Sequence, residues 1–295
     1  MARFCFVTLA LLVACFAVQV YGDPSEELNV AWENFLAHHP IKGASPQELA
    51  KRKGNFAKTH AMIEKHNKNK NATFQMEHNK FSIMLDYRGH ICLPAVKDQG
   101  ACGSCWAFGA VTPVEFAQCL IDGTPVRLSE QQVVDCDPTN YGCDVKVIGC
   151  TFHIDRFLRL SFDIEFFILQ DETCKYDDSM RAATVSSYEY VRPNRPYAMR
   201  TALMNYGPLA VAVALVDSFF QYSRGVYTDP ACDSSLPLSH ALVIVGWNTL
   251  NGIPHWICRN SWGSDWGRSG YIRIERGINL CDIEAHAAVV TGVVY

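Results

Sequence analysis

Residues 99–108 read Gln99-Gly100-Ala101-Cys102-Gly103-Ser104-Cys105-Trp106-Ala107-Phe108, and two interpretations of this stretch compete. In the first, Cys102 and Cys105 form a C-x-x-C, which is typical of a redox dithiol or of half a zinc site. In the second, Cys105 is a nucleophile at the start of a helix. The positive end of a helix and its unpaired backbone N–H groups favour the thiolate form of a cysteine placed there.

The rest of the chain favours the nucleophile. A zinc site needs about four ligands in suitable spacing, and the chain contains no second C-x-x-C. A redox dithiol needs both sulfurs, whereas other cysteines could pair with Cys102. A nucleophilic cysteine needs a base and a group that orients the base. His240 lies about 135 residues after Cys105, just before an apolar run, and Asn260 about 155 residues after it, just behind another.

Four motifs occur in order along the chain: QGACGSCWAF, LSEQQVVDC, SHALVIVGW and NSWGSDWGRSGYIRIERG. With them the chain resembles the papain-family cysteine proteases of the cathepsin L and H type, from about residue 26 to residue 290. The helical signature of that family's pro-region is also present, with Thr59 in place of an asparagine. Its other positions are Glu48, Arg52, Phe56, Ile63 and Asn67.

The resemblance implies an α+β fold of the papain-like two-lobe type. One lobe is mainly helical, the other is a β-barrel-like sheet, and a helical inhibitory pro-region precedes both. The sequence pattern agrees, because helical periodicity comes first and strand-like runs come later. We expect helices from about residue 25, from Ser45 to Asn67, from Ser104 or Cys105, and after Ser129. Strands are expected at 73–76, 208–215, 241–246, 255–259 and 270–274.

The resemblance also implies a role for each site residue. Cys105 attacks the peptide carbonyl as a thiolate, paired with His240 as imidazolium, which then gives its proton to the leaving amine. Asn260 accepts a hydrogen bond from the other ring nitrogen and fixes the imidazole. The side chain of Gln99 and the backbone N–H of Cys105 form the oxyanion hole. Trp262 shields the His–Asn hydrogen bond, and no metal or organic cofactor is needed.

Thirteen cysteines are more than a cytosolic enzyme usually has and indicate an oxidising compartment. The family's three disulfides map to Cys102–Cys143, Cys136–Cys174 and Cys232–Cys281, which takes Cys102 away from a dithiol. Cys105 remains as the nucleophile. The pairing of four others stays open, and a fourth bridge is possible among them: Cys92, Cys119, Cys150 and Cys258.

The amino terminus indicates the secretory pathway. Residues 4–20 are almost continuously apolar behind Arg3, and the polarity changes after Gly22, which is typical of a cleaved signal peptide. We therefore divide the chain into a signal peptide at 1–22, an inhibitory pro-region at 23–84 and a papain-like peptidase domain at 85–295. Asn71-Ala72-Thr73 is a glycosylation sequon.

These features predict a thiol endopeptidase made as a secreted or lysosomal proenzyme and acting as a monomer. Its partners are protein or peptide substrates and its own pro-region as inhibitor. No membrane contact is expected after signal cleavage. The net charge of −4 comes without a basic stripe, so a nucleic-acid partner is not expected. A non-catalytic relative that binds or inhibits proteases is the alternative, and a thiol oxidoreductase is the third hypothesis.

The chain departs from the family between the pro-region and the peptidase domain. Relatives place some twenty residues or more between an N-x-F-x-D motif and the Asp-Trp-Arg that opens the peptidase domain. Those residues lie along the active-site cleft and carry the activation cleavage. Here Asn79 and Phe81 are retained, Ile83 replaces the aspartate, and Asp86-Tyr87-Arg88 follows almost at once. The pro-region therefore cannot thread the cleft in the usual way.

Three further departures concern the peptidase domain. Asp144-Val145-Lys146 replaces an Asn-Gly-Gly whose backbone pairs with substrate, and residues 166–169 are Phe-Phe-Ile-Leu in place of a Tyr-Pro-Tyr, with both phenylalanines as candidate core. Pro113 lies inside the helix headed by Cys105, where it predicts a kink or local break. His286 aligns with the base of the pocket for the second residue upstream of the cut, or is a surface histidine.

Overall fold

The structure is a computed structural model that describes residues 24–41, 45–79, 82–138, 142–144, 159–161, 167 and 170–294. It forms two compact units, 1–40 and 41–295. The signal peptide expected at 1–22 lies outside the described residues. Among the residues that are described, no helix combines the length and apolar character needed to cross a bilayer.

The amino-terminal helices confirm two predictions and correct a third. Helix α1 spans Pro24–His38 and α2 spans Pro46–Asn67. The strand predicted at 73–76 is wrong, because this segment has no strand partner. The side chain of Asn67 instead binds both the N–H and the C=O of Met76, at 2.8 and 2.7 Å. These groups are therefore not available to a β-ladder.

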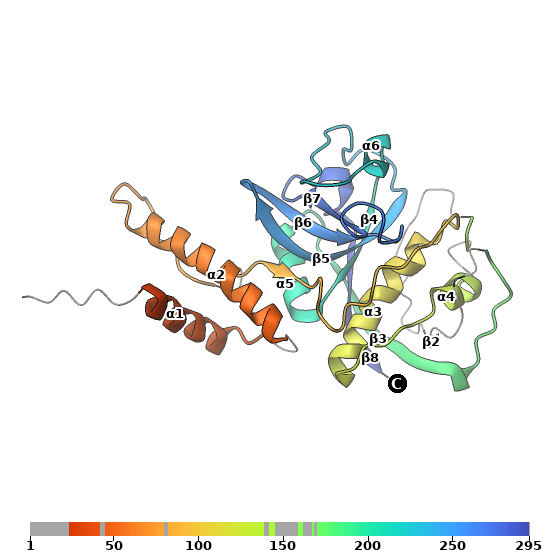
Figure 1. The fold of residues 1–295 in the computed structure, drawn as a ribbon. Helices are drawn as coiled ribbons and strands as arrows, with labels where there is room; N and C mark the ends of the chain where they lie inside the picture. Colours follow the sequence, from red (N-terminus) through yellow and green to blue (C-terminus); the bar gives the residue numbers. More distant parts are fainter. Residues whose placement is uncertain are drawn as a thin grey trace, which may run out of the picture. The chain divides into compact units, whose positions relative to one another are not determined.

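An antiparallel sheet organises the larger unit (Figure 1). Its main path runs β2-β3-β8-β4-β5-β6-β7, and β1 pairs with β5. The strands are β1 Leu85–Asp86, β2 Arg159–Ser161, β3 Arg181–Val191, β4 Leu209–Val213, β5 His240–Leu250, β6 Ile253–Arg259, β7 Tyr271–Glu275 and β8 Ala287–Val294. Four of these confirm the strands predicted after residue 200. Two of them matter for the site, since His240 opens β5 and Asn260 directly follows β6.

Helix α3, Cys105–Asp122, is the central helix of this unit and lies between α4 and β5 in Figure 1. The sequence predicts a kink or a local break at Pro113; the helix continues through this residue, so the break does not occur. Val111 and Val114 are fully buried on either side of the proline. Packing of that apolar face offsets the missing hydrogen bond. The other helices are α4 Glu130–Cys136, α5 Pro196–Tyr206 and α6 Asp217–Phe220, with 3₁₀ turns η1 Asp178–Met180 and η2 Leu280–Asp282.

Two hydrophobic clusters fill the larger unit, and α3 contributes to both. One gathers strands β4 to β8 around the fully buried Trp256. The other joins Cys105 and Val111 of α3 to Ala241 of β5 and Val134 of α4. The amino-terminal end of α3 and the beginning of β5 thus belong to one packed cluster. This arrangement positions the candidate site.

Four disulfides cross-link segments of the larger unit. The three bridges implied by the resemblance are present, Cys102–Cys143, Cys136–Cys174 and Cys232–Cys281. A fourth, Cys92–Cys119, ties the segment before α3 to the last part of the helix. Among the described cysteines, Cys105 and Cys258 take no part in a disulfide. Because Cys102 is bonded to Cys143, the structure holds no dithiol between Cys102 and Cys105.

Candidate functional site

Cys105 is the first residue of α3 and is buried. The loop before Cys105 is bonded to the segment that contains Cys143. The Cys102–Cys143 disulfide joins the two segments, and Gly103 N–H donates to Cys143 O at 3.1 Å. Trp106 adds a bond from its indole N–H to Gly142 O at 3.1 Å. The thiol therefore lies at the positive end of an 18-residue helix, and the loop that precedes it is cross-linked to Cys143.

His240 and Asn260 form a hydrogen-bonded pair. His240 Nε2 lies 2.7 Å from Asn260 Oδ1. Because Oδ1 also accepts the backbone N–H of Ser261 at 2.8 Å, the oxygen is the acceptor and the imidazole Nε2–H the donor. This leaves Nδ1 as the ring nitrogen for proton exchange. Burial lowers the pKa of His240 to about 4, against the Asn260 hydrogen bond, which favours the protonated ring.

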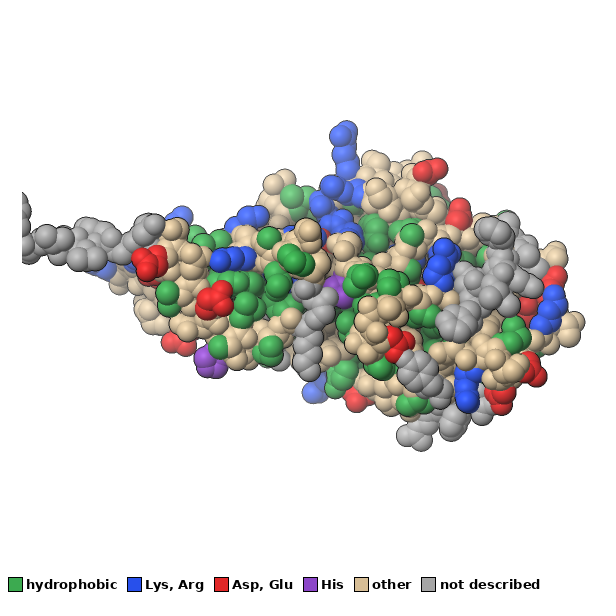
Figure 2. All heavy atoms as spheres, turned by 60° about the horizontal axis from the view of Figure 1, so that its bottom comes forward, with side chains coloured by type: hydrophobic (Ala, Val, Ile, Leu, Met, Phe, Trp, Pro, Cys, Tyr) green, Lys and Arg blue, Asp and Glu red, His purple; other side chains and the backbone are tan. Residues whose placement is uncertain are grey.

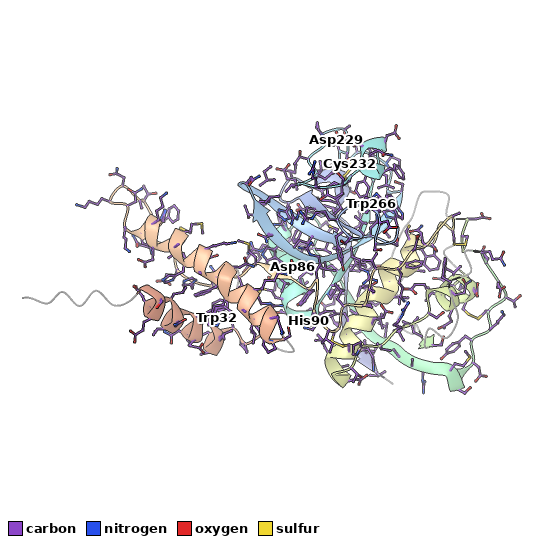
Figure 3. All side chains as sticks on the ribbon, in the orientation of Figure 1. Trp32, Asp86, His90, Asp229, Cys232 and Trp266 are labelled. Carbon is purple, nitrogen blue, oxygen red and sulfur yellow. A yellow bond between two sulfur atoms is a disulfide. The ribbon has the colours of Figure 1, made fainter. Side chains whose placement is uncertain are left out.

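Aromatic side chains pack against this pair. The ring of Trp262 lies 4.7 Å from that of His240, centroid to centroid. Trp262 also stacks on Phe220, with ring centroids 5.2 Å apart. It contacts Trp266, which is labelled in Figure 3, edge to face at 5.0 Å between centroids. Sequence reasoning did not find Phe220. Its only signal was the doublet Phe219-Phe220, in which Phe219 is buried and Phe220 half exposed.

Gln99 links the loop before Cys105 to the loop that carries Asn260. Its backbone N–H donates to Ser261 O at 2.8 Å, and its side-chain Oε1 accepts from Ser261 Oγ. Its Nε2 donates to Cys102 O at 2.9 Å, which uses one of the two amide hydrogens. Sequence reasoning missed Ser261, which lies beside Asn260 in the NSW motif and orients the Gln99 amide.

The four predicted site residues thus lie on adjoining elements. His240 contacts Asn260 directly, and Gln99 is joined to that pair through Ser261. Cys105 shares a packed cluster with Ala241, the neighbour of His240. A small cavity next to these residues is lined by residues of α3 from Phe108 onward, by the first residues of β5 after His240, and by Asn260. The site is therefore formed by the segment before α3, by α3 itself, by β5 and by the residues that follow β6.

A buried charged cluster lies next to this site and was not found from the sequence. Lys97 Nζ donates to Glu115 Oε1 at 3.0 Å and to both oxygens of Glu130 at 2.7 and 2.8 Å. Both carboxyls are almost fully buried, and one ammonium serves the two. Burial therefore raises the pKa of Glu130 to about 7 and also raises that of Glu115, although Lys97 opposes both shifts.

Replacing Glu130 by glutamine is expected to flatten the pH dependence of stability. A carboxyl whose folded-state pKa is raised contributes stability below its unfolded pKa of about 4.3, and that contribution is lost as pH rises through about 7. Wild-type protein should lose up to ~3 kcal/mol from this group between pH 4.5 and 7.5. Urea midpoints of both proteins across that range measure the difference, and the variant should lose less.

His240 and His255 titrate in the opposite sense, since burial lowers the pKa of each to about 4. Their contribution rises between pH 4 and 6.5 and is common to both proteins, so it cancels in the comparison. Replacement of the exposed Glu189 by glutamine is the matched control and should leave the profile of the wild type. If wild type and Glu130→Gln showed parallel profiles, this would contradict the raised pKa of the Glu130 carboxyl.

The structure answers part of the remaining sequence predictions. Asp144 is exposed, whereas Val145 and Lys146 lie outside the described residues. Phe166 is also outside them, but Phe167 packs edge to face on Phe108 at 5.1 Å, as a core residue would. The side chain of His286 is half exposed and lies 3.3 Å from Asp282, so it is a surface histidine in this structure.

The fold and these motifs place the chain in a known class. The profile of the papain family of cysteine proteases matches residues 82–291, and the chain belongs to that family. The profile of the cathepsin propeptide inhibitor domain matches residues 32–87. The two matched segments overlap at residues 82–87, where the predicted pro-region meets the peptidase domain.

Several cathepsins are similar to this chain. Pro-cathepsin H of Mus musculus is 35% identical over 211 residues, covering 69% of this chain and 63% of the relative. Pro-cathepsin H of Bos taurus is 30% identical with 93% of each chain covered. Cathepsin S of Bos taurus is 38% identical, covering 72% of this chain and 66% of the relative. The matches to the first and third thus span less than two thirds of those relatives.

Solved structures agree with the fold. Digestive procathepsin L 3 from the Tenebrio molitor larval midgut has a TM-score of 0.62 at 28% identity, covering 89% of this chain and 98% of that one. Digestive procathepsin L2 proteinase from the same source has a TM-score of 0.64 at 27% identity, covering 90% and 100%. The predicted α+β papain-like fold with a pro-region is confirmed.

Proposed function

We propose that the chain is a cysteine endopeptidase made as a secretory proenzyme. The observation that carries this proposal is the His240–Asn260 pair, held at 2.7 Å at the start of β5, beside a helix whose first residue is Cys105. Papain-family membership supports the same activity. The site has the three parts of a thiol protease: a nucleophile, a base and a group that orients the base.

In the proposed reaction the Cys105 thiol passes its proton to His240 Nδ1 and the thiolate sulfur attacks the peptide carbonyl carbon. His240 then protonates the leaving amine as the C–N bond breaks, and water hydrolyses the thioester with His240 as base. Burial alone favours the neutral imidazole, so the imidazolium depends on the charge of the neighbouring thiolate. Asn260 holds the ring, and the second amide hydrogen of Gln99 and the backbone N–H of Cys105 stabilise the oxyanion.

The test combines hydrolysis with the mapping of the reactive thiol. Purified protein is assayed with a fluorogenic dipeptidyl amide and then alkylated with an epoxysuccinyl peptide. Hydrolysis should stop when one equivalent has reacted, and mass spectrometry should find the label on Cys105. Cys258 is the internal control, because burial raises the pKa of its thiol and leaves it inert. Folded protein that hydrolyses nothing would refute the peptidase and support the protease-binding relative.

The remaining parts of the proposal concern processing and location. A signal peptide at 1–22, a pro-region at 23–84 and a peptidase domain at 85–295 are the proposed segments, with delivery to the lysosome or the cell exterior. Cathepsin relatives carry the prefix "pro" in their names. Protein or peptide substrates are the proposed partners; on the face drawn in Figure 2, Lys and Arg side chains gather in one group near the top of the view and elsewhere lie among acidic and apolar side chains.

A further inference from the structure

The segment that follows α2 runs back along the same helix. Near the carboxyl end of α2, His66 Nε2 contacts Phe74 O at 3.0 Å and the two rings lie 4.3 Å apart. Asn67 then binds the backbone of Met76. Two turns earlier on the helix, His78 stacks on Phe56 at 4.1 Å and contacts His60 Nδ1 at 2.9 Å. Later residues of this segment therefore contact earlier residues of α2, so the segment runs antiparallel to the helix.

A tight turn brings the chain from the helix to the sheet. Asn79 N–H donates to Ser82 Oγ at 2.9 Å, and Ser82 N–H donates back to Asn79 O at 2.8 Å. These two bonds hold positions 79 and 82 together. The described residues 74–79 and 82–87 are thus tied to α2, to this turn and to the sheet, and the two residues between them span at most ~7 Å when extended. This is too little for a passage through a cleft.

Beyond the turn, the chain is buried and tied to α2 again. Ser82, Ile83, Leu85 and Asp86 are all at most 4% exposed. Lys51 of α2 forms an ion pair with Asp86 at 2.8 Å, where α2 meets β5 (Figure 3). Although burial raises the pKa of Asp86, its bonds to Arg88 and Lys51 outweigh that effect and hold the pKa below its usual range.

The next residue continues the attachment on both sides. The guanidinium of Arg52 lies 5.7 Å from the centre of the Tyr87 ring. Tyr87 in turn donates its hydroxyl to Leu203 O of α5 at 2.9 Å and its N–H to Val245 O of β5 at 2.9 Å. Helix α2 is therefore joined through residues 86 and 87 to two elements of the peptidase domain.

This anchor is far from the candidate site. Strand β1 pairs with β5 at Gly246 and Trp247, whereas His240 is the first residue of β5. Five to seven residues separate positions 245–247, where this segment binds β5, from His240, which corresponds to ~17–23 Å at 3.3 Å per residue of strand. The connector that crosses the cleft in relatives is replaced here by one that runs along α2 and ends beside the middle of β5, at Gly246 and Trp247.

We propose that residues 46–87 form a permanent strap, with α2 clamped on the first strand of the peptidase domain and the connector kept out of the cleft. This inference replaces one part of the proposed function, the removal of the pro-region: the segment stays attached, the intact chain reacts with peptides, and the buried junction at 82–87 resists cleavage. The inference rests on the proposed endopeptidase and concerns the regulation of its site. Inhibition by a connector laid through the cleft is not available to this chain.

The test uses the full chain, purified at neutral pH without acid treatment. A tagged epoxysuccinyl peptide is added, and labelled protein is separated by mass. The label is expected on the uncleaved chain, at the rate found after limited proteolysis. Label that appears only together with a shortened peptidase domain would overturn the strap, while the endopeptidase would stand. Absence of label from both forms would refute the endopeptidase and this inference with it.

A second measurement follows cleavage within residues 82–87 by an added protease. Wild-type protein is expected to resist, and Lys51→Glu to be cut at the junction, because a second carboxylate beside Asp86 opens the clamp. Lys58→Glu reverses the charge of an exposed lysine on the same helix and should behave as the wild type. Junction cleavage at equal rates in wild type and Lys51→Glu would overturn the proposal even if the intact chain were labelled.

Discussion

Replacing Cys105 by serine is expected to lower kcat for peptide hydrolysis by ~10⁶-fold, the loss found when one member of an analogous serine-protease triad is removed. A serine hydroxyl is far less acidic than a thiol, so His240 cannot form with it the ion pair that activates Cys105. The measurement is the steady-state rate with a fluorogenic peptide. An unchanged melting temperature confirms that the variant is folded.

The same site predicts how a second substitution combines with the first. His240→Ala alone should reduce the rate about as much as Cys105→Ser, and the double variant should be no slower than either, because residues that act as one unit are strongly non-additive. Cys258→Ser is the matched control, since this thiol is fully buried in β6 and should contribute nothing to the rate. If Cys105→Ser kept its rate of hydrolysis and Cys258→Ser lost it, Cys105 would not be the nucleophile.

The parts of the site that the sequence predicted are those whose chemistry is carried by local motifs. Cys105, His240 and Asn260 are recognisable because the motifs around them resemble those of papain-family proteases, whereas a position next to an apolar run would not single out a histidine or an asparagine. The Lys97–Glu115–Glu130 cluster could not be predicted in this way. Glu130 reads as an ordinary first-turn acid of α4, and only the packing of α4 against α3 buries it beside Glu115. Burial of a charge is a property of tertiary contacts.

The course of the pro-region connector shows the same limit. Residues 73–76 alternate like a strand, but the side chain of Asn67 takes both backbone groups of Met76. The missing linker was visible in the sequence, and with it the conclusion that the cleft could not be threaded. Its physical consequence was not visible, because the contacts of His78 with Phe56 and of Asp86 with Lys51 join residues 22 to 35 positions apart.

Replacing Gly246 by alanine is expected to give the largest loss of stability among glycine substitutions in the sheet. A Cβ at this position would lie 2.2 Å from Leu85 O and 2.9 Å from Asp86 Cα, and both are backbone atoms. Because β1 cannot remain at this distance, the variant should lose about 3 kcal/mol of unfolding free energy. Thermal melts should show a fall of about 6–12 °C for a domain of this size.

The strap makes this substitution more than a local overlap, because displacement of β1 also moves Asp86 away from Lys51. Gly246→Ala should therefore expose residues 82–87 to an added protease as well as lower the melting temperature. Gly54→Ala is the matched control: a Cβ there meets nothing within 4 Å, and alanine should stabilise α2 by up to ~1 kcal/mol. Equal melting temperatures for Gly246→Ala and the wild type would contradict the close packing of β1 against Gly246. The attachment of the strap to β5 would then be contradicted as well.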